Sequence, residues 1–275
     1  MSYKQTMALT IAGSDSGGGA GIQADLKTFQ ELNVYGMSAI TAVTAQNTTG
    51  VQGVYPVEVE GILQQIDSIQ EDLPPHAIKT GMLFNSEIIE AVAGRLKNYE
   101  WKNIVVDPVM IAKGGAPLLL EEAVNSLKEH LLPLAEVITP NIPEAEVLTG
   151  MEIKTYEDKI NAIKILSSMG PKMVVLKGGH DADDEESVDI VYDGDTITEL
   201  RTSRIQTKNT HGTGCTFSSA IAAFLAQGKA PMEAVRLAKA FIQAAIEDSL
   251  DIGKGHGPTN HWAFNRKNRS RENHS

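Results

Sequence analysis

Short, apolar, β-branched stretches alternate with longer amphipathic stretches through most of the chain. Residues 103–107 (Asn-Ile-Val-Val-Asp) and 173–176 (Met-Val-Val-Leu) are nearly all apolar, as strands buried on both faces are. Strands separated by helices favour a mostly parallel sheet with helices on both faces. We therefore expect an α/β fold, extended by an antiparallel pair of strands around the turn Asp193-Gly194.

The expected elements follow from hydrophobic periodicity. Strands are expected at 7–12, 37–45, 77–80, 103–107, 137–139, 173–176, 187–192 and 196–202. Helices are expected at 21–32, 59–73, 86–97 (with Ser86 as N-cap), 119–132, 143–149, 157–169, 215–226 and 232–249. Neither a Pro/Ser-rich linker nor an internal repeat occurs, so we expect one domain at 1–264 and a frayed, polar, Arg-rich tail at 265–275.

Charge and composition exclude several classes of function. The 275 residues contain 24 Lys and Arg against 35 Asp and Glu, a net charge of −11. This balance argues against nonspecific binding to nucleic acid or to an anionic membrane surface. No apolar stretch approaches the roughly 18 to 20 residues that a membrane helix needs, and residues 1–7 show no signal-peptide pattern. The single cysteine, Cys215, excludes an intrachain disulfide and indicates a reducing compartment, so we expect a cytoplasmic protein.

A glycine-rich loop at 13–21 follows the first expected strand and leads into a helix. Such a loop lets backbone N–H groups approach a ligand, and the N-terminus of the helix favours negative charge. Residues 19–24 fit a loose G-x-G-x-x-A dinucleotide pattern, but the second strand ends in Gln46-Asn47 rather than in a ribose-binding acid. No P-loop motif occurs. The loop is therefore either a ligand-binding turn or a tight turn without a ligand.

A second glycine-rich turn, Thr210-His211-Gly212-Thr213-Gly214-Cys215, opens the apolar helix expected at 215–226. Its glycines can form a nest of N–H donors for an oxyanion or a phosphate. We expect the helix N-terminus to lower the pKa of Cys215 and to make its thiol more reactive than that of a free cysteine. The alternative is a buried cysteine that only packs the start of the helix.

Three further signals fall where expected strands end. Asn141 and Glu144 can hold a hydrated Mg²⁺ near phosphates, or they can simply cap the following helix. Lys177-Gly178-Gly179 suits close contact with a nucleotide, and Asp107 is a lone carboxylate that is a weak signal by itself. Because open α/β sheets bind ligands at the carboxyl ends of their strands, the convergence of these signals is stronger than any one of them.

Taken together, these segments resemble one enzyme family. From about Leu9 to about Arg266 the chain resembles the hydroxymethylpyrimidine/phosphomethylpyrimidine kinases of thiamine biosynthesis, members of the ribokinase-like superfamily. The motifs that carry the resemblance lie, in order, at 9–15, 18–25, 44–47, 79–82, 107–110, 139–145, 177–180 and 211–216. The resemblance implies a three-layer α/β/α ribokinase-like fold, a homodimer, and a kinase that depends on ATP and Mg²⁺. Its small-molecule substrates would be 4-amino-5-hydroxymethyl-2-methylpyrimidine and then the monophosphate of that pyrimidine.

The resemblance also implies roles for individual residues. Gln46 would hydrogen-bond the aminopyrimidine edge, because an amide offers a donor and an acceptor side by side. The pyrimidine pocket would be lined by Gly13, Ala20, Asp25, Met82 and Val109. The anion hole would be formed by Gly212, Thr213 and Gly214, with Cys215 where many members of the superfamily carry a catalytic Asp. Mg²⁺ and its waters would be ordered by Asn141 and Glu144, with Asp107 beside them. ATP would lie near Lys177, Gly178, Gly179, Lys239 and Lys113, and either Lys113 or Lys239 would neutralise the transferring phosphate.

Three other functions compete with this interpretation. Some pyridoxine/pyridoxal kinases of the superfamily carry Met-Asp in place of Gln46-Asn47 and a second cysteine in place of Ala112, so both positions here favour the pyrimidine. A catalytically silent nucleotide-binding module would not need the Mg²⁺ positions Asn141 and Glu144 or the base position Cys215. A nicotinamide dehydrogenase is disfavoured because Gln46 stands where an acidic residue is needed.

Overall fold

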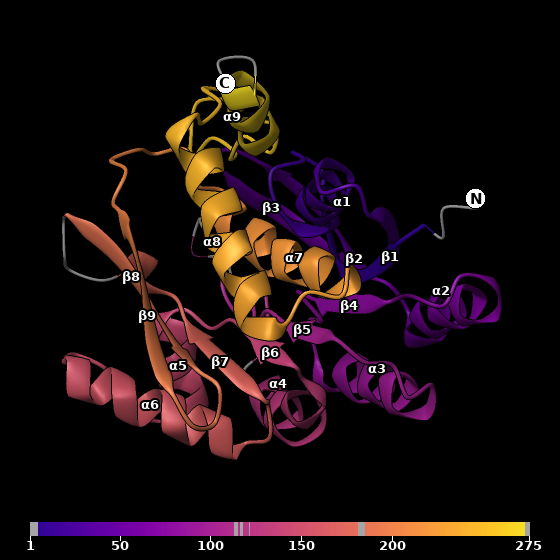
Figure 1. Cartoon of the computed structure of the whole chain (residues 1–275). Helices are drawn as coiled ribbons and strands as arrows, with labels where there is room; N and C mark the ends of the chain where they lie inside the picture. Colours follow the sequence, from indigo (N-terminus) through magenta and orange to yellow (C-terminus); the bar gives the residue numbers. More distant parts are fainter. Residues whose placement is uncertain (1–4, 113–114, 116–117, 121, 181–184, 273–275) are drawn as a thin grey trace.

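The computed structural model describes residues 5–112, 115, 118–120, 122–180 and 185–272. Over these ranges nine strands form one sheet in the order β3-β2-β1-β4-β5-β6-β7-β8-β9 (Figure 1). The strands are β1 (Met7–Asp15), β2 (Tyr35–Asn47), β3 (Gly50–Pro56), β4 (Ala77–Thr80), β5 (Ile104–Val106), β6 (Val137–Ile138), β7 (Met173–Leu176), β8 (Glu186–Tyr192) and β9 (Ile197–Ser203).

The middle of the sheet is parallel. β2, β1, β4, β5, β6 and β7 pair in parallel, whereas β3 with β2, β8 with β7, and β9 with β8 pair antiparallel. The expected mostly parallel sheet with an antiparallel extension is therefore confirmed. The chain order reverses beside β1, which lies between β2 and β4, and such a reversal is where open α/β sheets bind their ligands.

The central strands contribute side chains to a core on each face of the sheet, because successive side chains of a strand point to opposite sides. In β5, Ile104 and Val106 join the core on one face and Val105 joins the core on the other. β7 alternates between the two cores in the same way. This double burial explains why these strands are apolar without interruption.

Helices cover both faces of the sheet. They are α1 (Gly21–Glu31), α2 (Val59–Asp72), α3 (Ser86–Asn98), α4 (Ala123–Ser126), the π-helical turn η1 (Leu127–Leu131), the 3₁₀ turns η2 (Leu132–Leu134) and η3 (Gly178–His180), α5 (Ile142–Thr149), α6 (Tyr156–Ser168), α7 (Thr213–Ala226), α8 (Pro231–Glu247) and α9 (Ala263–Glu272). Phe29 of α1, Phe217 of α7 and Phe241 of α8 share one core, while α2 to α6 pack on the other. Figure 1 shows α7 and α8 on one side of the strands and α3, α4 and α6 on the other. No helix in the described ranges has the length and apolar character needed to cross a membrane.

Four details differ from the sequence-based expectation. β3 was not expected as a strand. It pairs with β2 through its backbone, and because its side chains are half-exposed, it lacks an apolar run that would have indicated a strand. The N-cap of α3 is Asn85, not Ser86, because the Asn85 side chain accepts a hydrogen bond from Ile88 N at 2.9 Å. The helix expected from 119 begins only at Ala123. Residues 265–272, expected as a frayed tail, continue α9, whose Lys267 pairs with Glu247 at 2.9 Å.

Candidate functional site

The two glycine-rich turns lie against each other. Gly212, the N-cap of α7, has a φ of +80°, and a Cβ atom at this position would collide with the carbonyl oxygen of Gly19. A Cβ atom at Gly19 would in turn lie only 2.5 Å from the His211 ring. Glycine at both positions therefore allows the loop at 13–21 to close against the turn at 210–215.

A cleft of about 600 Å³ opens where these turns meet the carboxyl ends of the strands. Such a volume is typical of small-molecule sites. Most of the site residues expected from the sequence line it together: Gly13, Ala20, Gln46, Met82, Asp107, Val109, Asn141, Glu144, Lys177, Gly179, Gly212, Thr213, Gly214, Cys215 and Lys239. Asp25 and Gly178 do not line it, and Lys113 lies outside the described residues.

Asp25 lies beneath the cleft rather than in its wall. Its Oδ2 accepts hydrogen bonds from Lys79 Nζ at 2.9 Å and from Thr10 Oγ1 at 2.6 Å, and both side chains of the Asp25–Lys79 pair are 0% exposed. Burial raises the pKa of Asp25 even though the Lys79 ammonium opposes the rise. Lys79 itself lines the cleft, so Asp25 acts on the cleft from behind, by holding Lys79 and through its charge on the Cys215 thiol.

A charged cluster lies at the ends of the neighbouring strands. Lys177 Nζ lies 3.0 Å from Asp107 Oδ1 and 3.8 Å from Glu144 Oε2. Burial acts to raise the pKa of Asp107, but Lys177 and Lys79 outweigh it and hold that pKa below its ordinary value. Burial raises the pKa of Glu144 to about 7 against the attraction of Lys177. One lysine thus lies between two carboxylates, and the cluster can accept further positive charge.

Asn141 and Glu144 also form the capping box at the start of α5. The Asn141 side chain accepts from Glu144 N at 2.8 Å, and the Glu144 carboxylate accepts from Asn141 N at 2.8 Å. The interpretation of Asn141 and Glu144 as residues that cap the following helix is therefore correct. Capping also fixes both side chains at the cleft wall, so it does not compete with a role in binding.

Cys215 is not the activated thiol that we expected. Burial raises the pKa of its thiol to about 11, although the nearby Lys79 ammonium lowers it. The carboxylates of Asp25 and Asp107 add to the rise. The prediction of a lowered pKa is wrong, because burial is the largest influence on this thiol. The residue is half-buried and lines the cleft, so a bound molecule can still reach it.

A third buried ion pair lies at the cleft. Lys239 Nζ lies 2.7 Å from Asp189 Oδ2, and Asp189 Oδ1 accepts a hydrogen bond from Gly178 N at 2.8 Å. A Cβ atom at Gly178 would collide with the backbone of Val188. Gly178 therefore shapes the turn after β7 from behind, while Gly179 and Lys239 face the cleft.

Gln46 lies beside a pair formed by Asp15 and His211. Asp15 Oδ2 lies 2.9 Å from His211 Nε2 and also accepts hydrogen bonds from the backbone N–H groups of Gly19 and Ala20. Burial acts to raise the pKa of Asp15, but the bonds from His211 and the loop hold it below its ordinary value. This carboxylate ties the two glycine-rich turns together next to the Gln46 amide.

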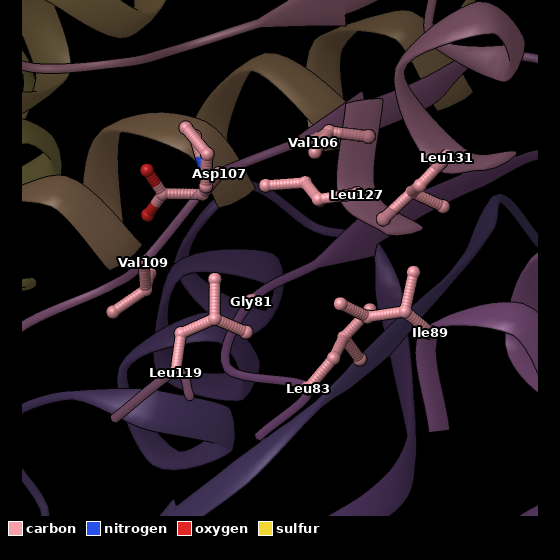
Figure 2. A pocket seen from close by; sticks show the side chains of 10 residues that line it. Gly81, Leu83, Ile89, Val106, Asp107, Val109, Leu119, Leu127 and Leu131 are labelled. Atoms are coloured by element: carbon pink, nitrogen blue, oxygen red, sulfur yellow. The ribbon is translucent and has the colours of Figure 1, made fainter. Parts of the chain in front are cut away.

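A small apolar cavity of about 10 Å³ lies between α3, the end of β5 and η1 (Figure 2). Leu83, Ile89, Leu127 and Leu131 line it. Figure 2 shows the Asp107 carboxylate turned away from these side chains. The cavity is too apolar for a polar ligand, and Asp107 marks the boundary between this core and the cleft.

The sequence analysis did not assign site roles to Lys79, Asp189 or the His211 side chain. Lys79 lies inside β4 and Asp189 lies inside β8, each flanked by apolar residues on at least one side, and charged side chains are rarely buried without a partner. That pattern could have identified both. Nothing local in the sequence indicates that His211 meets Asp15, because 196 positions separate them.

Comparison with known proteins gives consistent matches over nearly the whole chain. The family model described as phosphomethylpyrimidine kinase matches residues 15–260. The hydroxymethylpyrimidine/phosphomethylpyrimidine kinase of Bacillus subtilis (strain 168) is 56% identical over 259 residues, which are 94% of this chain and 96% of that protein. The pyridoxine kinase of the same strain is 48% identical over 260 residues, again 94% of this chain and 96% of that protein.

A solved structure agrees with the fold. The ADP complex of Bacillus subtilis pyridoxal kinase has a TM-score of 0.89 and 47% sequence identity to this chain, covering 95% of this chain and 99% of the other. The fold is therefore ribokinase-like, as expected from the motifs. On the family match and the identity to its curated members, the chain belongs to the phosphomethylpyrimidine kinase family.

Proposed function

We propose that this protein is a bifunctional kinase that uses ATP to phosphorylate 4-amino-5-hydroxymethyl-2-methylpyrimidine and then its monophosphate, in thiamine biosynthesis. The observation that carries the proposal is a single cleft that contains the Gln46 amide, the turn at 212–215 and the cluster of Lys177, Asp107 and Glu144. Membership of the phosphomethylpyrimidine kinase family supports the same activity.

The pyrimidine would bind at the end of the cleft near β1 and β2. Gln46 would pair with the aminopyrimidine edge, and the ring would lie among Gly13, Ala20, Met82 and Val109. A Cβ atom at Gly13 would collide with the end of the Met82 side chain, so these two residues pack closely in this part of the cleft. Asp25 would act from below, by holding Lys79 in place.

The phosphates would bind at the N-terminus of α7. The backbone N–H groups of Gly212, Thr213 and Gly214 would receive the transferring phosphoryl group. The Gly214 Cβ position lies 3.4 Å from Lys177 Nζ, so this lysine faces the same turn. ATP would extend from there toward Lys177, Gly179 and Lys239, with Gly178 shaping the turn from behind and Lys113 as a further candidate outside the described residues. Phosphoryl transfer depends mainly on positioning and charge neutralisation, which these groups supply.

The donor set in the charged cluster fits a hydrated Mg²⁺ better than a directly ligated one. Asn141, Glu144 and Asp107 offer oxygen atoms at the cleft wall. Over the part of the chain that the structure describes, no three His, Cys, Asp or Glu side chains are close enough to hold a metal ion. These residues would therefore hold the ion through its waters. When bound with ATP, Mg²⁺ shields the phosphate charge.

The two phosphorylations would place different demands on Cys215. The first acceptor is a neutral hydroxyl, whose proton must leave, and Cys215 would be the base that takes it. The second acceptor is already an anionic phosphate and needs no base. With a pKa of about 11, the thiol is a base only in a small fraction of molecules at neutral pH. The protein would work as one kinase domain at 1–264, as a homodimer in the cytoplasm.

A release assay for ADP with Mg·ATP tests the proposal. Hydroxymethylpyrimidine, its monophosphate and pyridoxine are compared side by side at equal concentration, with a reaction lacking Mg²⁺ as control. We expect turnover with both pyrimidines that depends on Mg²⁺. Turnover with neither pyrimidine would overturn the proposal, and ADP release that no acceptor stimulates would favour a nucleotide-binding module.

The second candidate is a pyridoxine/pyridoxal kinase. It is favoured by one observation, the similarity to the pyridoxine kinase and to the solved pyridoxal kinase of Bacillus subtilis. Gln46 and Ala112, which both line the cleft, are the positions that we expect to separate the two activities. Turnover with pyridoxine alone in the same assay would establish this second function instead.

A further inference from the structure

The oxygen and the nitrogen of the Gln46 side-chain amide each contact a neighbouring side chain, and the two neighbours differ in whether they can donate or accept a hydrogen bond. In the structure Nε2 of Gln46 lies 3.3 Å from Nε2 of His211, and Oε1 lies 3.2 Å from Oγ1 of Thr44. The backbone is fixed as well, because Ser16 Oγ donates to Gln46 O at 2.7 Å and accepts from Gln46 N at 2.8 Å. The remaining freedom of the amide is a half-turn that exchanges its oxygen and nitrogen.

The first constraint comes from His211. Its Nε2 lies 2.9 Å from Asp15 Oδ2, a carboxylate whose pKa is held low and which can therefore only accept. Nε2 of His211 must carry a hydrogen, whether the ring is neutral or charged. Since this hydrogen already bonds to Asp15, an amide oxygen can accept it only as the second acceptor of a three-centre bond, whereas an amide N–H group finds no acceptor on Nε2.

The second constraint comes from Thr44. Its hydroxyl donates to the carbonyl oxygen of Ser14 at 2.8 Å, and a hydroxyl has only one hydrogen to donate. Toward Gln46 the hydroxyl oxygen is free to accept. An amide N–H group would donate a full hydrogen bond to it, whereas an amide oxygen could only share the hydrogen that Thr44 gives to Ser14.

Both constraints, though independent, favour the same orientation. We infer that Asp15, His211 and Thr44 are positioning residues that fix the Gln46 amide with Oε1 toward His211 and Nε2 toward Thr44, and so set the direction in which the aminopyrimidine ring binds. The inference rests on the proposed function for the identity of the substrate.

The orientation of the amide decides where the hydroxymethyl group lies. The amino group of the pyrimidine donates to Oε1, and the adjacent ring nitrogen accepts from Nε2. The amino group therefore lies on the His211 side. The hydroxymethyl group is attached next to the amino-bearing carbon, so it lies on that side too, beside Gly212 and the anion hole. The reverse orientation would direct it toward Thr44, away from the phosphates.

The orientation can be observed without turnover. In ¹⁵N-edited NMR spectra, the Gln46 side-chain signal is identified by its loss in Gln46→Met. We expect nuclear Overhauser contacts from its N–H₂ hydrogens to the Thr44 methyl group. Contacts to the His211 ring hydrogens instead, or equal contacts to both, would overturn the inference.

The second measurement compares binding of two ligands by calorimetry. The 4-oxo analogue of the substrate presents an acceptor and then a donor, the reverse of the aminopyrimidine, so it pairs only with the reversed amide. We expect wild type to bind the aminopyrimidine at least about tenfold more tightly, which is the discrimination that one mispaired hydrogen bond gives. Thr44→Val and His211→Leu should reduce this ratio about tenfold.

Matched variants separate positioning from general damage to the fold. Thr44→Ser keeps the hydroxyl and His211→Gln keeps an N–H donor at similar reach, so both should retain the ratio. Thr28→Val removes a buried hydroxyl that bonds only to its own helix and should also retain it. A ratio unchanged in all variants would overturn the inference. If wild type binds neither pyrimidine, the proposed function fails, and the NMR contacts alone decide the amide orientation.

Discussion

The buried pair of Lys79 and Asp25 gives the sharpest stability prediction. Replacing Lys79 by Met leaves the Asp25 carboxylate 0% exposed, with only the Thr10 hydroxyl as a hydrogen-bond donor among the described residues. Removing one partner of a buried pair destabilises a protein by about 3–5 kcal/mol. For a chain of this size that corresponds to a fall in Tm of roughly 6–20 °C. Asp25→Asn removes the charge but keeps an oxygen for Thr10, so the double variant should lose about 2 kcal/mol less than the sum of the single variants.

The assay is urea unfolding at pH 7.5, followed by fluorescence and circular dichroism to establish a single transition. Lys154→Met is the control. The ion pair of Lys154 with Glu152 is shorter, at 2.6 Å, but both side chains are about 70% exposed. It should change stability by about 0.5 kcal/mol or less. Equal losses in Lys79→Met and Lys154→Met, or full additivity of Lys79→Met and Asp25→Asn, would refute the reasoning that burial rather than distance decides the energy.

Four further predictions concern the cleft. With the Cys215 pKa at about 11, the single-turnover rate of the first phosphorylation should rise roughly tenfold per pH unit between pH 7 and 9, and the rate of the second phosphorylation should not. Cys215→Ala should damage mainly the first phosphorylation. Parallel pH profiles for the two phosphorylations would show that Cys215 is not the base. Gly212→Ala should reduce kcat/KM for both pyrimidines at least about a hundredfold, because its methyl group would displace Gly19 and open the anion hole; a loss below tenfold in steady-state assays would contradict this. Gln46→Met should raise KM for the pyrimidine and shift the ratio of kcat/KM values toward pyridoxine, and an unchanged ratio would count against its role. Because the folded-state pKa of Glu144 is raised to about 7 from 4.5, wild type should lose stability relative to Glu144→Gln as pH rises through that interval, and a constant difference in urea titrations would disprove the shift.

The fold was largely predictable because double burial leaves a clear mark on the sequence. Strands such as β5 and β7 are apolar throughout and were placed within a residue or two. β3 was missed because its half-exposed side chains carry no such mark. The cap of α3 was misplaced by one residue because Asn85 and Ser86 are both good capping residues, and only the observed bond to Ile88 separates them.

The site was predictable in its parts but not in its electrostatics. Strand ends, glycine turns and motif order indicated the lining residues, because the sheet topology brings strand ends together. The predicted lowering of the Cys215 pKa was wrong, because the sequence shows where the helix starts but not that the thiol is buried or that carboxylates lie near it. Asp25 was expected in the pocket wall, yet it lies beneath Lys79, a depth that no local pattern reveals.

The stoichiometry of the complete reaction tests the central claim most directly. Limiting hydroxymethylpyrimidine is incubated with excess Mg·ATP until ADP release stops, and the product is identified by ³¹P NMR. The account predicts two ADP per pyrimidine and a diphosphate ester whose two phosphorus signals are coupled. One ADP per pyrimidine with a stable monophosphate would contradict the bifunctional activity, and no ADP release would contradict the kinase assignment itself.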